Sequence, residues 1–177
     1  METEYEPSGP YVFKTGKYAK KALEMLMFSP RGYRFLYWLL RKLNQKAGNG
    51  ERNELHKHIA WLIQKGKSRI ATKICPYCHV NPVQYFSVFL NREYGGIGSF
   101  GPLCCGKEEC LEKAESEDPM AIPALYHLDF SSLTRFSSTD AKDVVRLFRE
   151  VFGLQGRLTK KEAFRFFKKE VAMKPAS

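Results

Sequence analysis

Five cysteines in two clusters constrain the fold of this chain more than any other feature. Cys75-Pro-Tyr-Cys78 has the two-residue spacing at which both thiolates of a zinc knuckle point to one centre. The second cluster begins 26 residues later and reads CCGKEEC, with Cys104, Cys105 and Cys110. Zinc prefers a tetrahedron of thiolates or imidazoles, and a structural site is closed by protein ligands alone. We therefore predict a Zn²⁺ site formed by Cys75, Cys78, Cys105 and Cys110.

The surroundings of the second cluster agree with this prediction. Gly106 permits a turn after Cys105, and Cys110 falls at the start of a helix predicted over 108–114. The positive end of a helix dipole favours a thiolate at that position. One cysteine pair in a knuckle and another at a helix start resemble a treble-clef zinc finger. CCGKEEC is similar to the C-S-x-E-C end of several such fingers, with one extra residue.

That extra residue leaves Cys104 as an alternative to Cys105, and His79 could also replace a thiolate. A thioredoxin-like redox pair is disfavoured, because its motif should open a helix and the alternating VQYFSVFL here predicts a strand. Buried free thiols are a further alternative, which two clusters separated by a hairpin-length insert disfavour. A catalytic site is also disfavoured, since the chain lacks the His-x-Glu element of zinc deaminases. We predict a structural metal site and no catalytic residues.

Charge is distributed unevenly along the chain, whose net charge is +10. Residues 1–74 carry 15 Lys and Arg against 6 Asp and Glu, for a net +9, and residues 135–177 carry 11 against 5, for a net +6. Residues 75–134, which hold all five cysteines, carry 3 against 8, for a net −5. Basic segments at both ends favour a polyanionic partner. The acidic centre favours packing, or a protein partner, over contact with phosphates.

The N-terminal basic segment contains a glycine turn surrounded by cations. Lysine side chains at such a turn can contact phosphates, and a tyrosine among them can stack on a base. Arginines at the start of the following helix extend the positive surface. The alternative is an ordinary solvated charged face. The predicted nucleic-acid-binding residues are Lys14, Lys17, Tyr18, Lys20, Lys21, Arg31 and Arg34.

The same segment resembles the C-terminal domain of exodeoxyribonuclease X and its stand-alone relatives over about residues 11–44. The family has a G-K-Y/H-K-G-K-x-L turn, matched here at Gly16, Lys17, Tyr18, Lys21 and Leu23. It then has a [Y/F]-L-x-W-[L/I] helix, matched at Phe35, Leu36, Trp38 and Leu39. Lys20 stands where the second glycine of the family usually lies. The resemblance implies an accessory module in nucleic-acid processing that carries no catalysis itself.

Apolar spacing predicts an α+β chain of small, mostly helical modules, with a zinc-stabilised β-hairpin and helix in the centre. Ser29 as N-cap and Pro30 as first helical residue begin a helix that extends to Leu43. We expect Trp38, at the centre of this helix, to belong to the hydrophobic core. Further helices are predicted at 22–28, 53–65, 140–152 and 160–171, with Thr159 and Glu162 as a capping box for the last. The predicted boundaries are 11–73 for the basic module, 74–116 for the zinc finger, 117–138 for a hinge and 139–172 for a helical hairpin.

We therefore expect a zinc-stabilised protein that binds DNA or RNA without catalysis. One alternative is an adaptor that binds proteins through its acidic zinc module. The other is a metal-dependent nuclease or hydrolase, which is disfavoured because Asp118, Asp129, Asp140 and Asp143 are scattered rather than clustered. The acidic, polar N-terminus does not resemble a signal peptide, and no apolar run is long enough to span a bilayer. A cytoplasmic location and no membrane partner are expected.

Overall fold

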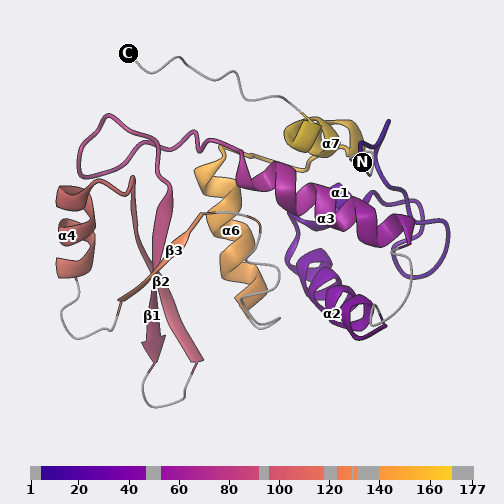
Figure 1. Ribbon diagram of the computed structural model, residues 1–177, viewed down its shortest axis with the longest axis horizontal. Helices are drawn as coiled ribbons and strands as arrows, with labels where there is room; N and C mark the ends of the chain where they lie inside the picture. The colour runs from indigo at the N-terminus through magenta and orange to yellow at the C-terminus, as the bar shows by residue number, and fades with distance from the viewer. Residues whose placement is uncertain are drawn as a thin grey trace. The chain divides into compact units, whose positions relative to one another are not determined.

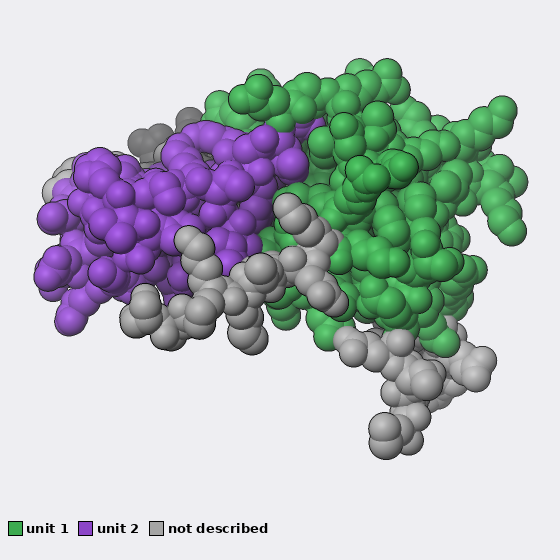
Figure 2. Space-filling view, turned by 90° about the horizontal axis from the view of Figure 1, so that it is seen from above, with its two compact units in different colours: residues 1–69, 129–146, 155–177 green, residues 70–128, 147–154 purple. Residues whose placement is uncertain are grey.

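The computed structural model describes residues 5–46, 53–91, 96–117, 123–128, 130 and 140–168. These residues form helices and one small antiparallel sheet, which confirms the α+β class (Figure 1). The chain divides into two compact units, coloured separately in Figure 2. Unit 1 comprises residues 1–69, 129–146 and 155–177, and unit 2 comprises 70–128 and 147–154. No described helix has the length and apolar character needed to cross a membrane.

Unit 1 begins with a hairpin-like loop over residues 11–23. Val12 and Ala22 form an isolated antiparallel bridge, and the Lys20 N–H donates to the Phe13 carbonyl oxygen at 2.8 Å. Gly16 turns the chain with a φ of 82°, as its sequence context predicts. Lys20 also lies in the left-handed region, with a φ of 64°, a conformation that favours glycine.

Two helices follow, α1 (Leu23–Leu26) and α2 (Pro30–Lys46). The Gly32 N–H donates to Ser29 Oγ at 3.1 Å, so Ser29 caps α2 and Pro30 is its first residue, as predicted. A Cβ at Gly32 would lie 2.6 Å from the carbonyl oxygen of Leu26, which is backbone and cannot rotate away. Glycine at this position therefore permits the close approach of α2 to α1.

Helix α2 buries one face and exposes the other. Tyr33, Leu36 and Leu40 are buried, while Phe35 is only half-buried. Trp38 is 53% exposed, so the prediction that it belongs to the core is wrong. The reason is helix geometry: Trp38 is two residues from both Leu36 and Leu40, and two residues correspond to a rotation of about 200° around the axis.

Helix α3 (Glu54–Lys67) and helix α7 (Lys160–Lys168) complete the helical core of unit 1. The Asn53 side chain caps α3 by accepting the His56 N–H at 2.9 Å. Helix α7 packs against α1 and α3, and its Phe164 ring stacks on Trp61 of α3 with centroids 5.8 Å apart. Phe167 of α7 is also buried in this core.

Unit 2 contains a three-stranded antiparallel sheet in the order β2-β1-β3 (Figure 1). Strand β1 (Tyr85–Asn91) and strand β2 (Gly96–Cys104) form the predicted hairpin, and helix α4 (Glu108–Ser116) contacts β2. Strand β3 (Pro123–His127) pairs with β1, with Phe86 opposite Tyr126. We predicted a hinge over 117–138, so β3 is a correction: part of that segment completes the sheet.

Helix α6 (Ala141–Val151) is shared between the units, since residues 141–146 belong to unit 1 and 147–151 to unit 2. Phe148 and Phe152 stack on each other with their rings almost parallel, at 5°. The Thr72 N–H donates to the Val151 carbonyl oxygen at 3.0 Å within unit 2. The segment predicted as a separate helical hairpin over 139–172 is thus divided: α7 and the first part of α6 belong to unit 1, and the end of α6 belongs to unit 2.

Candidate functional site

Four of the five cysteines lie together in unit 2. The Sγ atoms of Cys75, Cys78, Cys105 and Cys110 are all within 4.8 Å of one another, and all five cysteines are free thiols. The Cys78 and Cys105 sulfurs are 3.7 Å apart, far beyond a disulfide bond of about 2.0 Å. A tetrahedral ion with metal–sulfur bonds of about 2.3 Å places its sulfurs about 3.8 Å apart. The cluster can therefore hold a metal ion.

The first cysteine pair is positioned by a tight loop between Ile74 and Pro82, which form an antiparallel bridge. The Cys75 N–H donates to the Asn81 carbonyl oxygen at 2.8 Å, and the His79 N–H donates to the Cys75 carbonyl oxygen at 3.0 Å. His79 has a φ of 55°, in the left-handed region. This turn curls the backbone around the sulfurs, so that Cys75 and Cys78 face one centre.

The second pair is positioned by the end of β2 and the first turn of α4. Gly106 directly follows Cys105 and has a φ of 87°. A Cβ at Gly106 would lie 2.3 Å from the Tyr85 ring, so both conformation and space require glycine. Cys110 lies in the first turn of α4, as predicted, and its N–H donates to the Lys107 carbonyl oxygen at 2.9 Å.

The protein environment acts differently on the individual thiols. A hydrogen bond from the backbone of Asn81 lowers the pKa of Cys78 to about 6. Burial raises the pKa of Cys110 to about 12. The Asn81 side chain also donates to the sulfurs of Cys78 and Cys105, at 3.8 and 4.0 Å. Buried thiolates this close repel one another, so the fully deprotonated cluster needs a cation.

The structure distinguishes the four cluster cysteines from the alternatives. Cys104 is fully buried at the end of β2, where burial raises its pKa, and it is outside the group of four sulfurs. His79 is exposed at the outer side of its turn and is also outside the group. The contacts of Asn81 with the cysteine sulfurs were not predicted from the sequence. The position of Asn81 three residues after Cys78 was the available signal.

Replacing His79 with glycine should retain the metal and raise the free energy of unfolding by about 1 kcal/mol, because it relieves a left-handed backbone. Metal content per chain and urea unfolding would measure both effects. Val80→Gly is the matched control, since Val80 is exposed but lacks a positive φ, and it should lower stability instead. Loss of metal from His79→Gly would show that the imidazole is a ligand.

The predicted nucleic-acid-binding residues come together in unit 1. The Tyr18 hydroxyl donates to the Arg31 carbonyl oxygen at 3.0 Å, and the Tyr18 ring lies 4.7 Å from that of Phe35. These contacts attach the hairpin-like loop to the outer face of α2. We define the basic–aromatic surface as the seven predicted residues together with Phe35, Trp38, Arg41 and Lys42. Its cations are all exposed.

The charge of this surface has one sign. Residues 11–46 contain nine Lys and Arg and a single acidic residue, Glu24. Glu24 is completely buried, so it adds no acidic side chain to the exposed surface. Cations also lie beside the rings: Lys17 Nζ is 5.8 Å from the Tyr18 centroid and Lys42 Nζ is 5.6 Å from the Trp38 centroid. Such a surface is suited to anionic ligands that carry flat rings.

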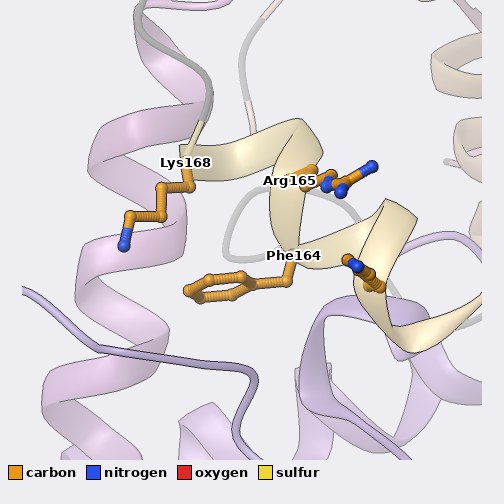
Figure 3. Close-up of a pocket in the computed structure, with 4 residues that line it drawn as sticks. Phe164, Arg165 and Lys168 are labelled. Carbon is orange, nitrogen blue, oxygen red and sulfur yellow. The ribbon is translucent and has the colours of Figure 1, made fainter.

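A second group of cations lies on α7, also in unit 1. Lys161, Arg165 and Lys168 line a surface depression whose floor is Phe164. Lys168 extends beside the Phe164 ring, with its Nζ 5.7 Å from the centroid, while Arg165 points away (Figure 3). The predicted capping box begins the helix, because Thr159 Oγ1 accepts the Glu162 N–H at 3.2 Å.

The sequence did not predict a buried contact between a histidine and a carboxyl group. His58 Nε2 lies 2.7 Å from Glu24 Oε1, and both side chains are at most 1% exposed. The Tyr5 hydroxyl lies 3.1 Å from His58 Nδ1, and the Tyr11 N–H donates to Glu24 Oε1 at 3.2 Å. Because 34 residues separate the pair, the one available signal was a histidine within the apolar stripe of α3.

The described aspartates do not form a nuclease-like cluster. Asp143 pairs with Arg146 at 3.3 Å on α6, and Asp140 immediately precedes that helix. Asp118 and Asp129 lie outside the described residues. Across the described part of the chain, the four cysteines are the one group of three or more side chains arranged to hold a metal.

Comparisons with protein-family models, with curated proteins and with solved structures each return no match.

Proposed function

We propose that this chain is a zinc-stabilised nucleic-acid-binding protein and acts as a non-catalytic accessory in DNA or RNA processing. The observation that carries the proposal is the basic–aromatic surface. Every exposed charge between residues 11 and 46 is positive, and three aromatic rings lie among these charges. Cations that neutralise phosphates supply most of the affinity in such complexes, and aromatic rings add stacking on bases.

The backbone at Lys20 supports the resemblance to the exodeoxyribonuclease X accessory domain. That family usually has glycine at this position, and a left-handed φ of 64° is a physical reason for glycine there. The packing of Tyr18 on Phe35 joins the two matched motifs, and the hydrogen bond from the Lys20 N–H to the Phe13 carbonyl oxygen closes the loop that contains the first. The accessory role follows from the resemblance, since in nucleases the module lies beside the catalytic domain.

Zinc is the ion that best fits the cysteine cluster. Four thiolates in a tetrahedron are typical of structural zinc, and a site with four protein ligands has no open position for a substrate. The order of knuckle, β-hairpin, glycine turn and helix supports a treble-clef arrangement. Cys75, Cys78, Cys105 and Cys110 would hold the ion. It would stabilise unit 2 rather than take part in chemistry.

Reversing two charges of the basic–aromatic surface should test the proposal. Lys17→Glu/Arg31→Glu should weaken binding to a labelled oligonucleotide roughly tenfold or more, because two phosphate contacts become repulsive. The slope of log affinity against log salt should become shallower by about 1.4 to 1.8, depending on strandedness. Fluorescence anisotropy at several salt concentrations measures both quantities.

The matched control is Lys113→Glu/Lys142→Glu, which changes the net charge equally at exposed positions outside the surface. It should retain most of the affinity. Equal losses in the two double variants would show that net charge alone drives association. No association of the metal-loaded protein with DNA or RNA at low salt would refute the proposed function.

A further inference from the structure

The packing of unit 1 does not explain why the Trp38 side chain is exposed. It is 53% exposed on a helix whose opposite face supplies the buried Leu36 and Leu40. The chain contains one other tryptophan, Trp61, which is 3% exposed and donates its indole N–H to Glu6 Oε2 at 3.0 Å. The core of unit 1 therefore does not use Trp38. Its large aromatic surface faces outward at a cost in hydrophobic free energy.

The Trp38 ring continues a row of aromatic rings. It stacks on Phe35 with centroids 6.1 Å apart and planes 30° apart, and Phe35 in turn lies 4.7 Å from Tyr18. Helical spacing also places cations beside Trp38: Arg34 and Lys42 are four residues before and after it, and Arg41 is three residues after it. A flat ligand on Trp38 would thus have positive charges on both sides along the helix.

We infer that the basic–aromatic surface takes single-stranded nucleic acid, with a base stacked on Trp38 and the flanking phosphates near Arg34, Arg41 and Lys42. The inference rests on the proposed function and narrows its ligand. Bases inside a duplex stack on one another, and their faces are closed to a side chain. Bases of a single strand are open to aromatic side chains, and each such stack contributes strongly to affinity without sequence preference.

The extent of the surface sets the size of the ligand. From Arg31 to Lys42 the outer face of α2 spans about 17 Å at 1.5 Å per residue. Bases stacked at about 3.4 Å cover this length with roughly five nucleotides. The exposed loop lysines Lys14 and Lys17 add further cations to the surface. A single strand of twelve nucleotides therefore covers the site with margin, and a twelve-base-pair duplex of the same sequence is the matched competitor.

Trp38→Lys separates stacking from charge, because it removes the aromatic face while raising the net charge from +10 to +11. We expect the variant to bind the single strand about 5- to 100-fold more weakly than the unaltered protein does. Its duplex affinity should stay equal or rise slightly. Trp38→Phe keeps a ring at the position and should retain most of the single-strand affinity. Anisotropy with both ligands, with metal-loaded protein, measures these effects.

Intrinsic fluorescence supplies an independent readout. Stacking of a base on Trp38 should quench the emission of the unaltered protein when the unlabelled single strand is added. The quenching should be lost in Trp38→Phe, because the remaining Trp61 is buried. Far-ultraviolet circular dichroism shows whether each variant keeps its helices, which the exposed position of Trp38 leads us to expect.

The possible results separate this inference from the proposed function. If Trp38→Lys binds the single strand as tightly as the unaltered protein or more tightly, stacking on Trp38 is wrong while charge-driven binding stands. Equal affinity of the unaltered protein for both strand forms would also overturn the inference and leave nucleic-acid binding intact. Absence of binding to either ligand at low salt would overturn the proposed function itself.

Discussion

Replacing Cys105 with serine should release the metal and unfold unit 2, whereas the same change at the adjacent Cys104 should leave the metal bound. The two positions differ in one respect that matters: the Cys105 sulfur lies within the group of four, 3.7 Å from that of Cys78, and the Cys104 sulfur lies outside it. Loss of one ligand opens the tetrahedron and leaves three thiols, two of them buried, without their cation. Both cysteines are buried, so each serine variant buries a hydroxyl group and any general effect of that change is the same in both.

The expected effect is large because metal binding is coupled to folding. Structural zinc contributes on the order of 10–16 kcal/mol in small domains, which matches or exceeds the whole stability of a typical domain at about 5–15 kcal/mol. Cys105→Ser should thus lose the sheet signal of unit 2 at room temperature. Cys104→Ser should lower the free energy of unfolding by about 1–3 kcal/mol, because it buries a hydroxyl group with poor hydrogen bonding.

Elemental analysis of metal per chain, together with thermal melting before and after a strong chelator, measures the difference. The unaltered protein and Cys104→Ser should each hold one ion and lose thermal stability on chelation. Cys105→Ser should hold none and be indifferent to the chelator. A full complement of metal in Cys105→Ser, or its loss in Cys104→Ser, would contradict the assignment of ligands.

Replacing His58 with leucine should lower the free energy of unfolding by about 3–5 kcal/mol. The imidazole is the side chain that pairs with Glu24, whose carboxyl group is fully buried. Glu24 Oε2 already lacks a hydrogen-bond partner among the residues that the structure describes. Without His58, the carboxyl group would keep the Tyr11 N–H but lose its 2.7 Å contact. Removing one partner of a buried pair carries a penalty of this size.

The double variant Glu24→Leu/His58→Leu tests whether the loss arises from the pair. Removing both polar groups removes the unpaired carboxyl group, so the double variant should be more stable than His58→Leu alone. Urea unfolding measures all three proteins. Lys57→Ala is the control on the exposed side of the same helix and should change stability by less than about 0.5 kcal/mol. If the losses of unfolding free energy in the single variants simply add in the double variant, the two groups do not interact.

Features with a local cause were predictable from the sequence. The cap at Ser29 and the capping box of Thr159 and Glu162 each involve residues three apart, and the structure confirms both. The grouping of four cysteines was predicted from spacing within two short segments and from a glycine turn. In each case the chemistry needs a particular backbone shape that only a few neighbouring residues determine.

Features that depend on distant contacts were missed. Strand β3 lies in a segment whose composition suggested a hinge, and it becomes a strand by pairing with β1. Glu24 and His58 are 34 residues apart in the sequence and lie on different helices. Neither residue type by itself predicts burial. Trp38 was assigned to the core because it is an apolar residue in a helix. It lies two residues from both Leu36 and Leu40, which are buried, so helix geometry places it on the opposite, exposed face.

The sequence by itself determined the two cysteine clusters, the helix starts and the separation of basic and acidic segments, because each arises from residue type and short-range spacing. Only the tertiary structure decided that Cys105 rather than Cys104 joins the cluster, since strand pairing sets which of two adjacent side chains faces the other sulfurs. It also decided that Glu24 is buried while Trp38 and the eight cations of the basic–aromatic surface are exposed. Burial depends on what packs against a residue, and spacing along the chain does not contain that information.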